Sequence, residues 1–290
     1  LPDHWTEAAA YLDGRDDGTR VLELPGTDFA AYRWGNTVDP ITPGLMDRPY
    51  VARELIPLGT PVSANLVNAI DRPLQEGTFL PEALALLARL IGAGDIVLRS
   101  DLEYERFRTP RPETTWALLR SAPGLDEPVR FGEPVENQPR EQLPLLDEIE
   151  LATDQGLEDP PPVAVFAITD PAPIVRALPT EHPIVVAGDG DGLVAATSAG
   201  VVDPDRAVLY SAGLLDSEDP AMFDTVLDDG ADIVITDSNR RRARRWGREP
   251  VPLPPRLRGC SDRAALCQTV RASPHRCPPL PSGTTRERDT

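Results

Sequence analysis

Three glycines stand at every second position after a hydrophobic run in "VVAGDGDGLVAA", residues 185–196. A strand, a glycine loop and a helix in this order can hold a nucleotide phosphate, because backbone N–H groups and a helix N-terminus attract anions. Here Asp189 and Asp191 lie where the anion would approach, and the last glycine of G-x-G-x-x-G is missing. The sequence favours a tight strand-to-helix turn with capping aspartates over a phosphate site, and it predicts no cofactor.

Other catalytic patterns match poorly. "AATSAG" around Ser198 lacks the first glycine of G-x-S-x-G, and His4 and His182 are better explained as structural or solvated side chains. "GDGDGL" stops after two aspartates and so does not match a calcium loop, and the cysteine spacing of the tail is a poor zinc match. We therefore expect no catalytic residue and no metal ligand in this chain.

The stretch "SDLEYERFRTPRP" brings Asp101, Glu103 and Arg106 close together, with Glu105 and Arg108 beside them. Carboxylates and guanidinium groups at this density could line a polar groove for sugar hydroxyls. The alternative, which the residue types favour, is a charged, exposed strand end. Asp101, Glu103 and Arg106 are our candidates for contact with a glycan.

Two further groups of side chains could contact a glycan or a lipid phosphate. Phe29, Tyr32 and Trp34 could stack on a sugar ring or on each other in a core, and we select Tyr32 and Trp34. The run of five arginines from residue 240 to 245 follows Ser238, a suitable helix N-cap. Its first three members, Arg240, Arg241 and Arg242, could bind an anionic headgroup or lie on a solvated helix face.

Periodicity predicts the elements that carry these residues. "LPDHWTEAAAYLDG" predicts a helix capped by Asp3, "RVLELPG" a strand, and "FLPEALALLARLIGAG" an amphipathic helix. "DIVLRSDLEYERF" predicts a strand with a polar second half. Prolines between residues 37 and 72 predict long ordered loops.

The second half of the sequence has a different pattern of apolar residues. "PVAVFAI", "PIVVAG", "AVLYSAG" and "DIVITD" are short apolar runs separated by helical stretches, which is typical of a parallel sheet covered by helices. We expect a two-part, mixed α/β fold whose second half is a small Rossmann-like, mostly parallel sheet flanked by helices. The expected parts are an α/β domain at 1–135, a Pro-rich acidic linker at 136–161, a Rossmann-like domain at 162–247, and a disordered or frame-shifted tail at 248–290.

Composition excludes some classes of partner. The formal net charge is −18, whereas a nucleic-acid surface needs clustered basic residues, so we expect no nucleic-acid partner. No run approaches the roughly 18 apolar residues that span a bilayer. Because the sequence opens on Leu1, we expect it to be a piece of a longer protein.

Several strings taken together resemble one family. They are "LPDHWTEAAAYLD", "VLELPGTDFAAYRWGNTVDP", "GDIVLRSDLEYERFRTPRP", "GDGDGLVAATSAGVVD", "VLYSAGLL" and "VITDSNRRRARRW". In this order they are similar to the extracytoplasmic part of the actinobacterial membrane α-(1→3)-arabinofuranosyltransferases of the GT-C type. The resemblance covers about residues 1 to 247.

The resemblance implies a role in building the cell wall. The complete enzyme would take arabinofuranose from a polyprenyl-phosphate donor and transfer it to arabinan or arabinogalactan. Its transmembrane helices and catalytic carboxylate would precede Leu1, so this fragment would lie on the extracytoplasmic face of the membrane and position the acceptor or act as a scaffold. Alternatives are a stand-alone glycan-binding module without catalysis, a nucleotide-using α/β enzyme, or a purely structural spacer.

Overall fold

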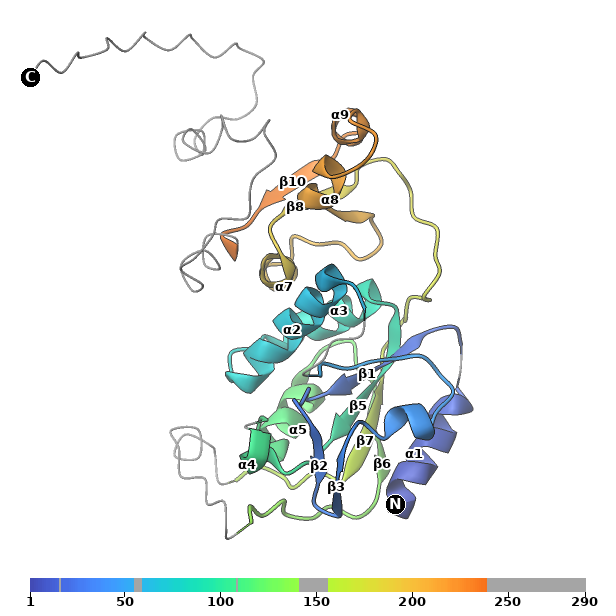
Figure 1. The fold of residues 1–290 in the computed structure, drawn as a ribbon, viewed down its shortest axis with the longest axis vertical. Coiled ribbons are helices and arrows are strands. Elements are labelled where there is room, and N and C mark those ends of the chain that lie inside the picture. Colours follow the sequence, from blue (N-terminus) through green and yellow to red (C-terminus); the bar gives the residue numbers. More distant parts are fainter. Residues whose placement is uncertain (16, 55–58, 108, 141–155, 239–290) are drawn as a thin grey trace, which may run out of the picture. The chain divides into compact units, whose positions relative to one another are not determined.

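The computed structural model describes residues 1–15, 17–54, 59–107, 109–140 and 156–238. These residues form a five-stranded sheet, a three-stranded sheet and a two-stranded hairpin, with helices against both larger sheets (Figure 1). The strands are β1 (Arg20–Leu24), β2 (Ala30–Tyr32), β3 (Gly35–Val38), β4 (Tyr50–Val51), β5 (Ala93–Arg99), β6 (Val129–Phe131), β7 (Val163–Ala167), β8 (Ile184–Ala187), β9 (Val208–Tyr210) and β10 (Asp232–Ile235). The α-helices are α1 (Asp3–Asp13), α2 (Pro61–Gln75), α3 (Leu84–Leu90), α4 (Tyr104–Phe107), α5 (Pro112–Ser121), α7 (Gly190–Ser198), α8 (Ser211–Leu215) and α9 (Met222–Asp228); Thr42–Gly44 and Pro81–Ala83 are 3₁₀ turns.

The first sheet has the order β4-β1-β5-β7-β6. Strands β4, β1 and β5 are parallel, whereas β5, β7 and β6 are antiparallel neighbours. Alternate side chains of each central strand enter two separate cores, as the two-residue period of a strand requires. Leu22 and Ile96 belong to the core beneath α2, α3 and α5, whereas Val21 and Val97 belong to the core that contains α1. The sheet is therefore buried on both faces.

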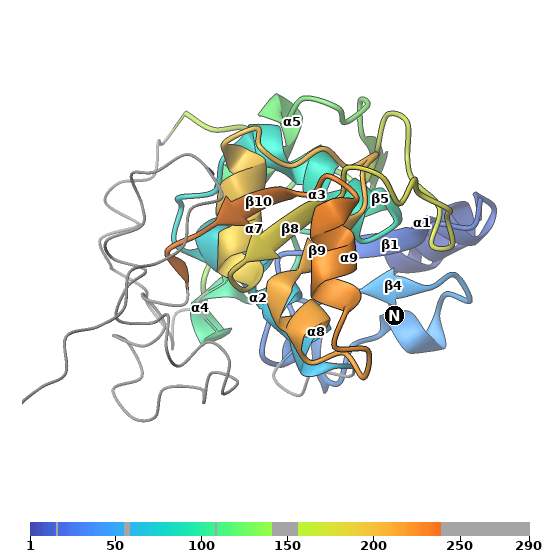
Figure 2. The same cartoon turned by 90° about the horizontal axis from the view of Figure 1, so that it is seen from above.

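The second sheet is parallel throughout, with the order β10-β8-β9. Helix α7 connects β8 to β9, and α8 and α9 connect β9 to β10. Helix α7 contacts both β8 and α2 and lies between them in Figure 1, and in the view from above the second sheet and α7 overlap α2 (Figure 2). Leu66 of α2 and Leu90 of α3 pack against the core of the second sheet, so the two sheets share apolar contacts.

The expected helix at the N-terminus is confirmed, with Trp5, Ala8, Ala9 and Leu12 buried on one face. The capping residue was wrong, because Pro2 is the N-cap and Asp3 is the first helical residue. Within the region expected as loops, helix α2 starts at Pro61, where Thr60 accepts a hydrogen bond from the Ser63 N–H. Proline at the first helical position is compatible with this start, since its missing N–H would have no partner there.

The apolar run "PVAVFAI" was expected in the second sheet, but it forms β7 of the first sheet. A continuous apolar run is typical of any strand buried on both faces, so the pattern did not indicate which sheet would receive it. The expected boundary at 136–161 therefore does not separate the two sheets. The expected tail at 248–290 lies outside the described residues.

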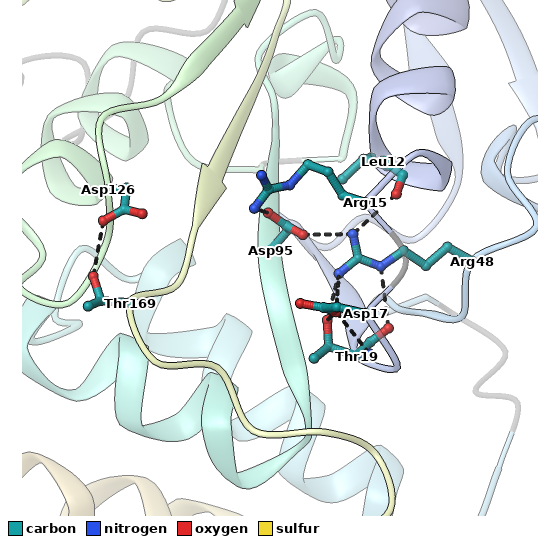
Figure 3. A network of polar contacts seen from close by, with 8 residues as sticks. All are labelled: Leu12, Arg15, Asp17, Thr19, Arg48, Asp95, Asp126 and Thr169. Atoms are coloured by element: carbon teal, nitrogen blue, oxygen red, sulfur yellow. Dashed lines mark hydrogen bonds and ion pairs between the residues drawn. The ribbon is translucent and has the colours of Figure 1, made fainter.

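A buried ionic network ties α1 to the start of the first sheet (Figure 3). The guanidinium of Arg48 donates to Asp95 at 2.7 Å and to the hydroxyl of Thr19 at 2.6 Å. It also donates to the carbonyl oxygen of Leu12 at the end of α1, at 3.3 Å. Arg48 and Asp95 are both fully buried, so these partners replace the water that each charge loses on folding.

Candidate functional site

Polar side chains collect at the carboxyl ends of β1 and β5. These two adjacent parallel strands lie where the strand order changes direction, since β4 is on one side and β7 on the other. Open α/β sheets bind ligands outside the carboxyl ends of strands at such a point. Glu23 of β1 and Arg99 of β5 face each other there as a buried ion pair at 3.1 Å.

The Glu23 and Arg99 pair is held by further contacts. Arg99 also donates to the carbonyl oxygen of Pro25, and Thr42 donates its hydroxyl hydrogen to Glu23. Burial alone would lower the pKa of Arg99, but the nearby Glu23 carboxylate, together with other acidic groups, raises it above the usual value. Arg99 therefore stays positively charged and serves as a fixed counter-charge in the sheet.

Asp101, one of the predicted contact residues, joins three nitrogen groups from distant segments. Its Oδ2 atom accepts hydrogen bonds from the indole N–H of Trp5 at 2.9 Å and of Trp34 at 2.8 Å. The Nε2 atom of His4 lies 3.4 Å from the same oxygen. Tyr32 stacks on Trp34 with ring centroids 4.7 Å apart and is fully buried. We call these five residues the Asp101 cluster.

Of the two alternatives for the aromatic residues, stacking within a core is therefore the one observed for Tyr32 and Trp34. Phe29 instead packs against Phe107 and remains partly exposed. Trp34 is only partly buried, so within the Asp101 cluster its ring reaches the surface while Tyr32 and Asp101 support it from inside.

The acidic residues that follow Asp101 are buried as well, in contrast to the expected exposed strand end. Glu105 accepts a bidentate pair of hydrogen bonds from Arg33, at 2.6 and 2.7 Å. Glu103 forms ion pairs with Arg106, at 3.7 Å, and with Arg140. Arginines supplied by other segments thus allow a densely acidic stretch to fold inward.

The pKa values of two carboxyl groups near these strand ends move in opposite directions. Burial by itself would raise the pKa of Glu105, but the hydrogen bonds from Arg33 and from the Arg140 N–H lower it below its ordinary value. Burial and the nearby Glu23 carboxylate raise the pKa of Glu54. Compared with a free glutamate, the pKa is therefore lower for Glu105 and higher for Glu54.

Backbone N–H groups of the glycine loop donate hydrogen bonds to side chains of the protein itself. The N–H of Gly190 donates to the Asn65 side chain at 2.6 Å, and the N–H of Gly192 donates to the Asp189 side chain, which caps α7. Ser238 accepts from the N–H of Asp189 at 3.1 Å. The predicted cap is confirmed for Asp189, and three N–H groups that could have bound a phosphate bind protein oxygens instead.

Close packing explains why this loop contains glycine. A Cβ atom on Gly190 would lie 2.8 Å from the backbone oxygen of Asn65, and one on Gly188 or Gly192 would meet the hydroxyl of Thr236 at about 2 Å. Asp191 forms an ion pair with Arg72 of α2, so the loop also links the two sheets. The three glycines thus permit the close contact of α7 with α2 and with the segment after β10.

Sequence reasoning identified Tyr32, Trp34, Asp101, Glu103 and Arg106, and the structure places all five at the carboxyl end of the first sheet. It missed His4 and Trp5 as partners of Asp101, since their contact spans almost a hundred residues. It also missed the pair of Glu23 and Arg99, for which the only available signal was a charged residue inside each apolar strand. Arg240, Arg241 and Arg242 lie outside the described residues.

Comparison with known families agrees with the resemblance found in the sequence. The family model described as "Alpha-(1->3)-arabinofuranosyltransferase, N-terminal GT-C domain" matches residues 1–251. The α-(1→3)-arabinofuranosyltransferase of Mycolicibacterium smegmatis is 36% identical over 136 residues, which are 47% of this chain and 10% of that protein. The one of Mycobacterium tuberculosis is 30% identical over 177 residues, which are 59% of this chain and 12% of that protein. The chain thus spans about a tenth of the length of these relatives.

Solved structures share the mixed α/β fold. The cryo-EM structure of the arabinofuranosyltransferase AftD from mycobacteria superposes with a TM-score of 0.62 at 24% identity, over 82% of this chain and 17% of that one. A structure of a single-site mutant of the same enzyme gives a TM-score of 0.63 at 22% identity, over 82% of this chain and 18% of that one. Among the helices of the described residues, none is long and apolar enough to cross a membrane.

Proposed function

Because the chain belongs to the α-(1→3)-arabinofuranosyltransferase family, we propose that it is the part of such an enzyme that positions the glycan acceptor over the catalytic region. The acceptor is cell-wall arabinan or arabinogalactan, and the donor is arabinofuranose on a polyprenyl phosphate. The donor site, the membrane-spanning helices and the catalytic carboxylate belong to other segments of the longer protein. This chain then lies on the extracytoplasmic face of the membrane.

One observation carries the proposal of a positioning role. At the switch point of the first sheet, where an α/β enzyme would bind its substrate, Asp101 accepts hydrogen bonds from two tryptophans, and Glu23 pairs with Arg99. These groups orient one another, and all of them except Trp34 are buried. A framework of this kind suits a rigid surface that holds a ligand better than it suits a reaction centre that must exchange protons with one.

The second sheet supports the same role. From its parallel strands and connecting helices we propose that it is a small Rossmann-like layer. The place where such a layer usually binds a nucleotide would here be filled by packing contacts. Since the Gly190 N–H is bound to the Asn65 side chain, a phosphate would have to displace that side chain before it could bind there. This argues against a nucleotide-using enzyme.

The partly exposed predicted residues are the candidates for direct contact with the glycan or a lipid phosphate. Trp34 is partly exposed and Arg106 is exposed, whereas Tyr32, Asp101 and Glu103 are buried and fix their positions. Arg240, Arg241 and Arg242 complete the proposed set. An aromatic ring can bind the apolar face of a sugar, and a guanidinium group can bind its hydroxyl groups.

Calorimetric titration of the intact 290-residue chain tests this proposal. Arabinan oligosaccharides should give a saturable heat, and ADP and NAD should give none. Saturable binding of ADP or NAD without glycan binding would contradict the acceptor role and restore the glycine loop as a site. If no ligand binds, the chain is a structural spacer rather than a positioning module.

A further inference from the structure

Residues 132–140 follow β6 and form neither helix nor strand. Asn137 is the one buried residue among these nine, and only 7% of it is exposed. The side chain of asparagine is polar, and such a side chain is seldom buried unless its donors and acceptors have partners. The partners of Asn137 therefore show what this exposed stretch does at the sheet.

The side-chain amide of Asn137 binds the backbone just beyond β5. Its Nδ2 atom donates to the carbonyl oxygen of Ser100 and, at 2.9 Å, to that of Leu102. On its other side this backbone pairs with β2, because the carbonyl oxygen of Asp101 accepts the N–H of Arg33 at 2.7 Å. Alternate carbonyl groups of an extended chain point in opposite directions, so Asn137 takes the place of a neighbouring strand on the side away from β2.

The amide oxygen of Asn137 reaches the turn between β2 and β3. It accepts a hydrogen bond from the Nε atom of Arg33, the residue directly before Trp34. The other two guanidinium nitrogens of Arg33 donate to Glu105, at 2.6 and 2.7 Å. Arg33 is thus held through its backbone by Asp101 and through its side chain by Asn137 and Glu105.

A carboxamide suits these three hydrogen bonds. Two carbonyl oxygens require donors and the Nε atom of Arg33 requires an acceptor, and asparagine supplies both kinds of group on one planar side chain. An aspartate at this position would offer no donor to the carbonyl oxygens of Ser100 and Leu102. A glutamine would add a methylene group to a buried place, where extra volume forces its neighbours to shift.

We propose that Asn137 is a positioning residue for Trp34; the inference rests on the proposed acceptor role of this site. Asp101 fixes the indole N–H of Trp34 at 2.8 Å, whereas Asn137, through Arg33, fixes the backbone from which the ring projects. A surface that is ordered before binding holds its ligand more tightly, because the ligand does not have to order it. Asn137 therefore contributes to glycan affinity without touching the glycan.

Calorimetric titration of the 290-residue chain with an arabinan oligosaccharide compares three variants with the wild type. Asn137→Ala should bind about tenfold more weakly, because the ligand then has to order the turn. Asn137→Asp keeps the shape and the acceptor for Arg33 but loses both donors, and it should also weaken binding. Gln138→Ala should bind like the wild type, since Gln138 is exposed and its side chain donates to Glu136 of the same stretch.

Indole N–H resonances measured by nuclear magnetic resonance separate positioning from folding. The Trp34 resonance, assigned with Trp34→Phe, should shift and broaden in both Asn137 variants and should stay in place in Gln138→Ala. Trp116 belongs to the core on the other face of the first sheet, whereas Trp34 packs against the core that contains α1. The Trp116 resonance should therefore keep its wild-type position in all three variants.

Three outcomes would contradict the positioning role. If the wild type binds the glycan and Asn137→Ala binds it equally well, or if the Trp34 resonance stays in place in both Asn137 variants, the positioning role is overturned and the acceptor role stands. Weakened binding with a displaced Trp116 resonance would mean that Asn137 only stabilises the fold, which also overturns the positioning role. If the wild type binds no glycan, the acceptor role fails and the positioning role fails with it.

Discussion

The Oδ2 atom of Asp101 lies 2.8 Å from the indole nitrogen of Trp34, and the same oxygen accepts the indole N–H of Trp5. One carboxylate oxygen therefore fixes helix α1, the turn between β2 and β3, and the end of β5 in one arrangement. Asp101 and Trp34, which the sequence analysis selected for contact with a ligand, thus hold three segments of the chain together. Substitutions at this and related contacts should change the stability of the chain in ways that can be measured.

Replacing Asp101 with alanine should lower the free energy of unfolding by about 3 kcal/mol, because two buried or half-buried indole N–H groups lose their acceptor. Urea denaturation followed by tryptophan fluorescence measures this change. Asp216→Ala removes an exposed carboxylate at the end of α8 and should change stability by less than about 0.5 kcal/mol. Equal effects of the two substitutions would show that Asp101 does not organise its cluster.

Replacing Arg99 with methionine should cost about 3 to 5 kcal/mol of stability, because Glu23 would remain as a buried charge without its partner. The double variant Arg99→Met with Glu23→Leu should lose much less than the two single variants added together. A double-mutant cycle by chemical denaturation gives the coupling. Strict additivity would mean that the two charges do not stabilise each other.

Gly190→Ala should destabilise the chain by about 1 to 3 kcal/mol, because the new methyl group would meet the backbone of α2 at 2.8 Å. Gly213 of α8 provides the matched control, since a methyl group added there would have nothing within 4 Å of it. Gly213→Ala should leave stability unchanged or raise it by up to about 1 kcal/mol. Thermal unfolding of the two variants should therefore shift in opposite directions or by clearly different amounts.

Glu105 should make the stability of the chain depend on pH in the acidic range. Its pKa is lower in the folded chain than the ordinary value of 4.5, so its stabilising effect is present above that value and is lost as pH falls through the folded pKa. Comparing the free energy of unfolding at neutral pH and in acid, Glu105→Gln should lose less stability on acidification than the wild type. A larger loss in the variant would contradict the lowered pKa.

Sequence periodicity predicted α1, α3 and the strands of the parallel second sheet, but it missed helix α2, which lies in a region expected as loops. The apolar face of α1 and the strands β8, β9 and β10 could be predicted from residue spacing, because the repeat of a helix or strand determines which of its side chains share a face. The placement of β7 in the first sheet could not be predicted, because pairing with β5 depends on long-range competition between equally apolar strands.

The candidate site, like the fold, could be predicted from the sequence only in part. Asp101, Glu103 and Trp34 could be selected from residue type, but their burial depends on His4, Trp5 and on arginines from other segments. No local pattern indicates such partners. The glycine loop was different, since the aspartates inside it already argued against a phosphate, and the contact with Asn65 supplies the physical reason for its glycines.

The acceptor role is tested most directly by calorimetric titration of the intact chain with an arabinan oligosaccharide beside a titration with ADP. We expect saturable binding of the glycan at a single class of site and no heat from ADP beyond dilution. Saturable binding of ADP together with silence toward the glycan would contradict the acceptor role.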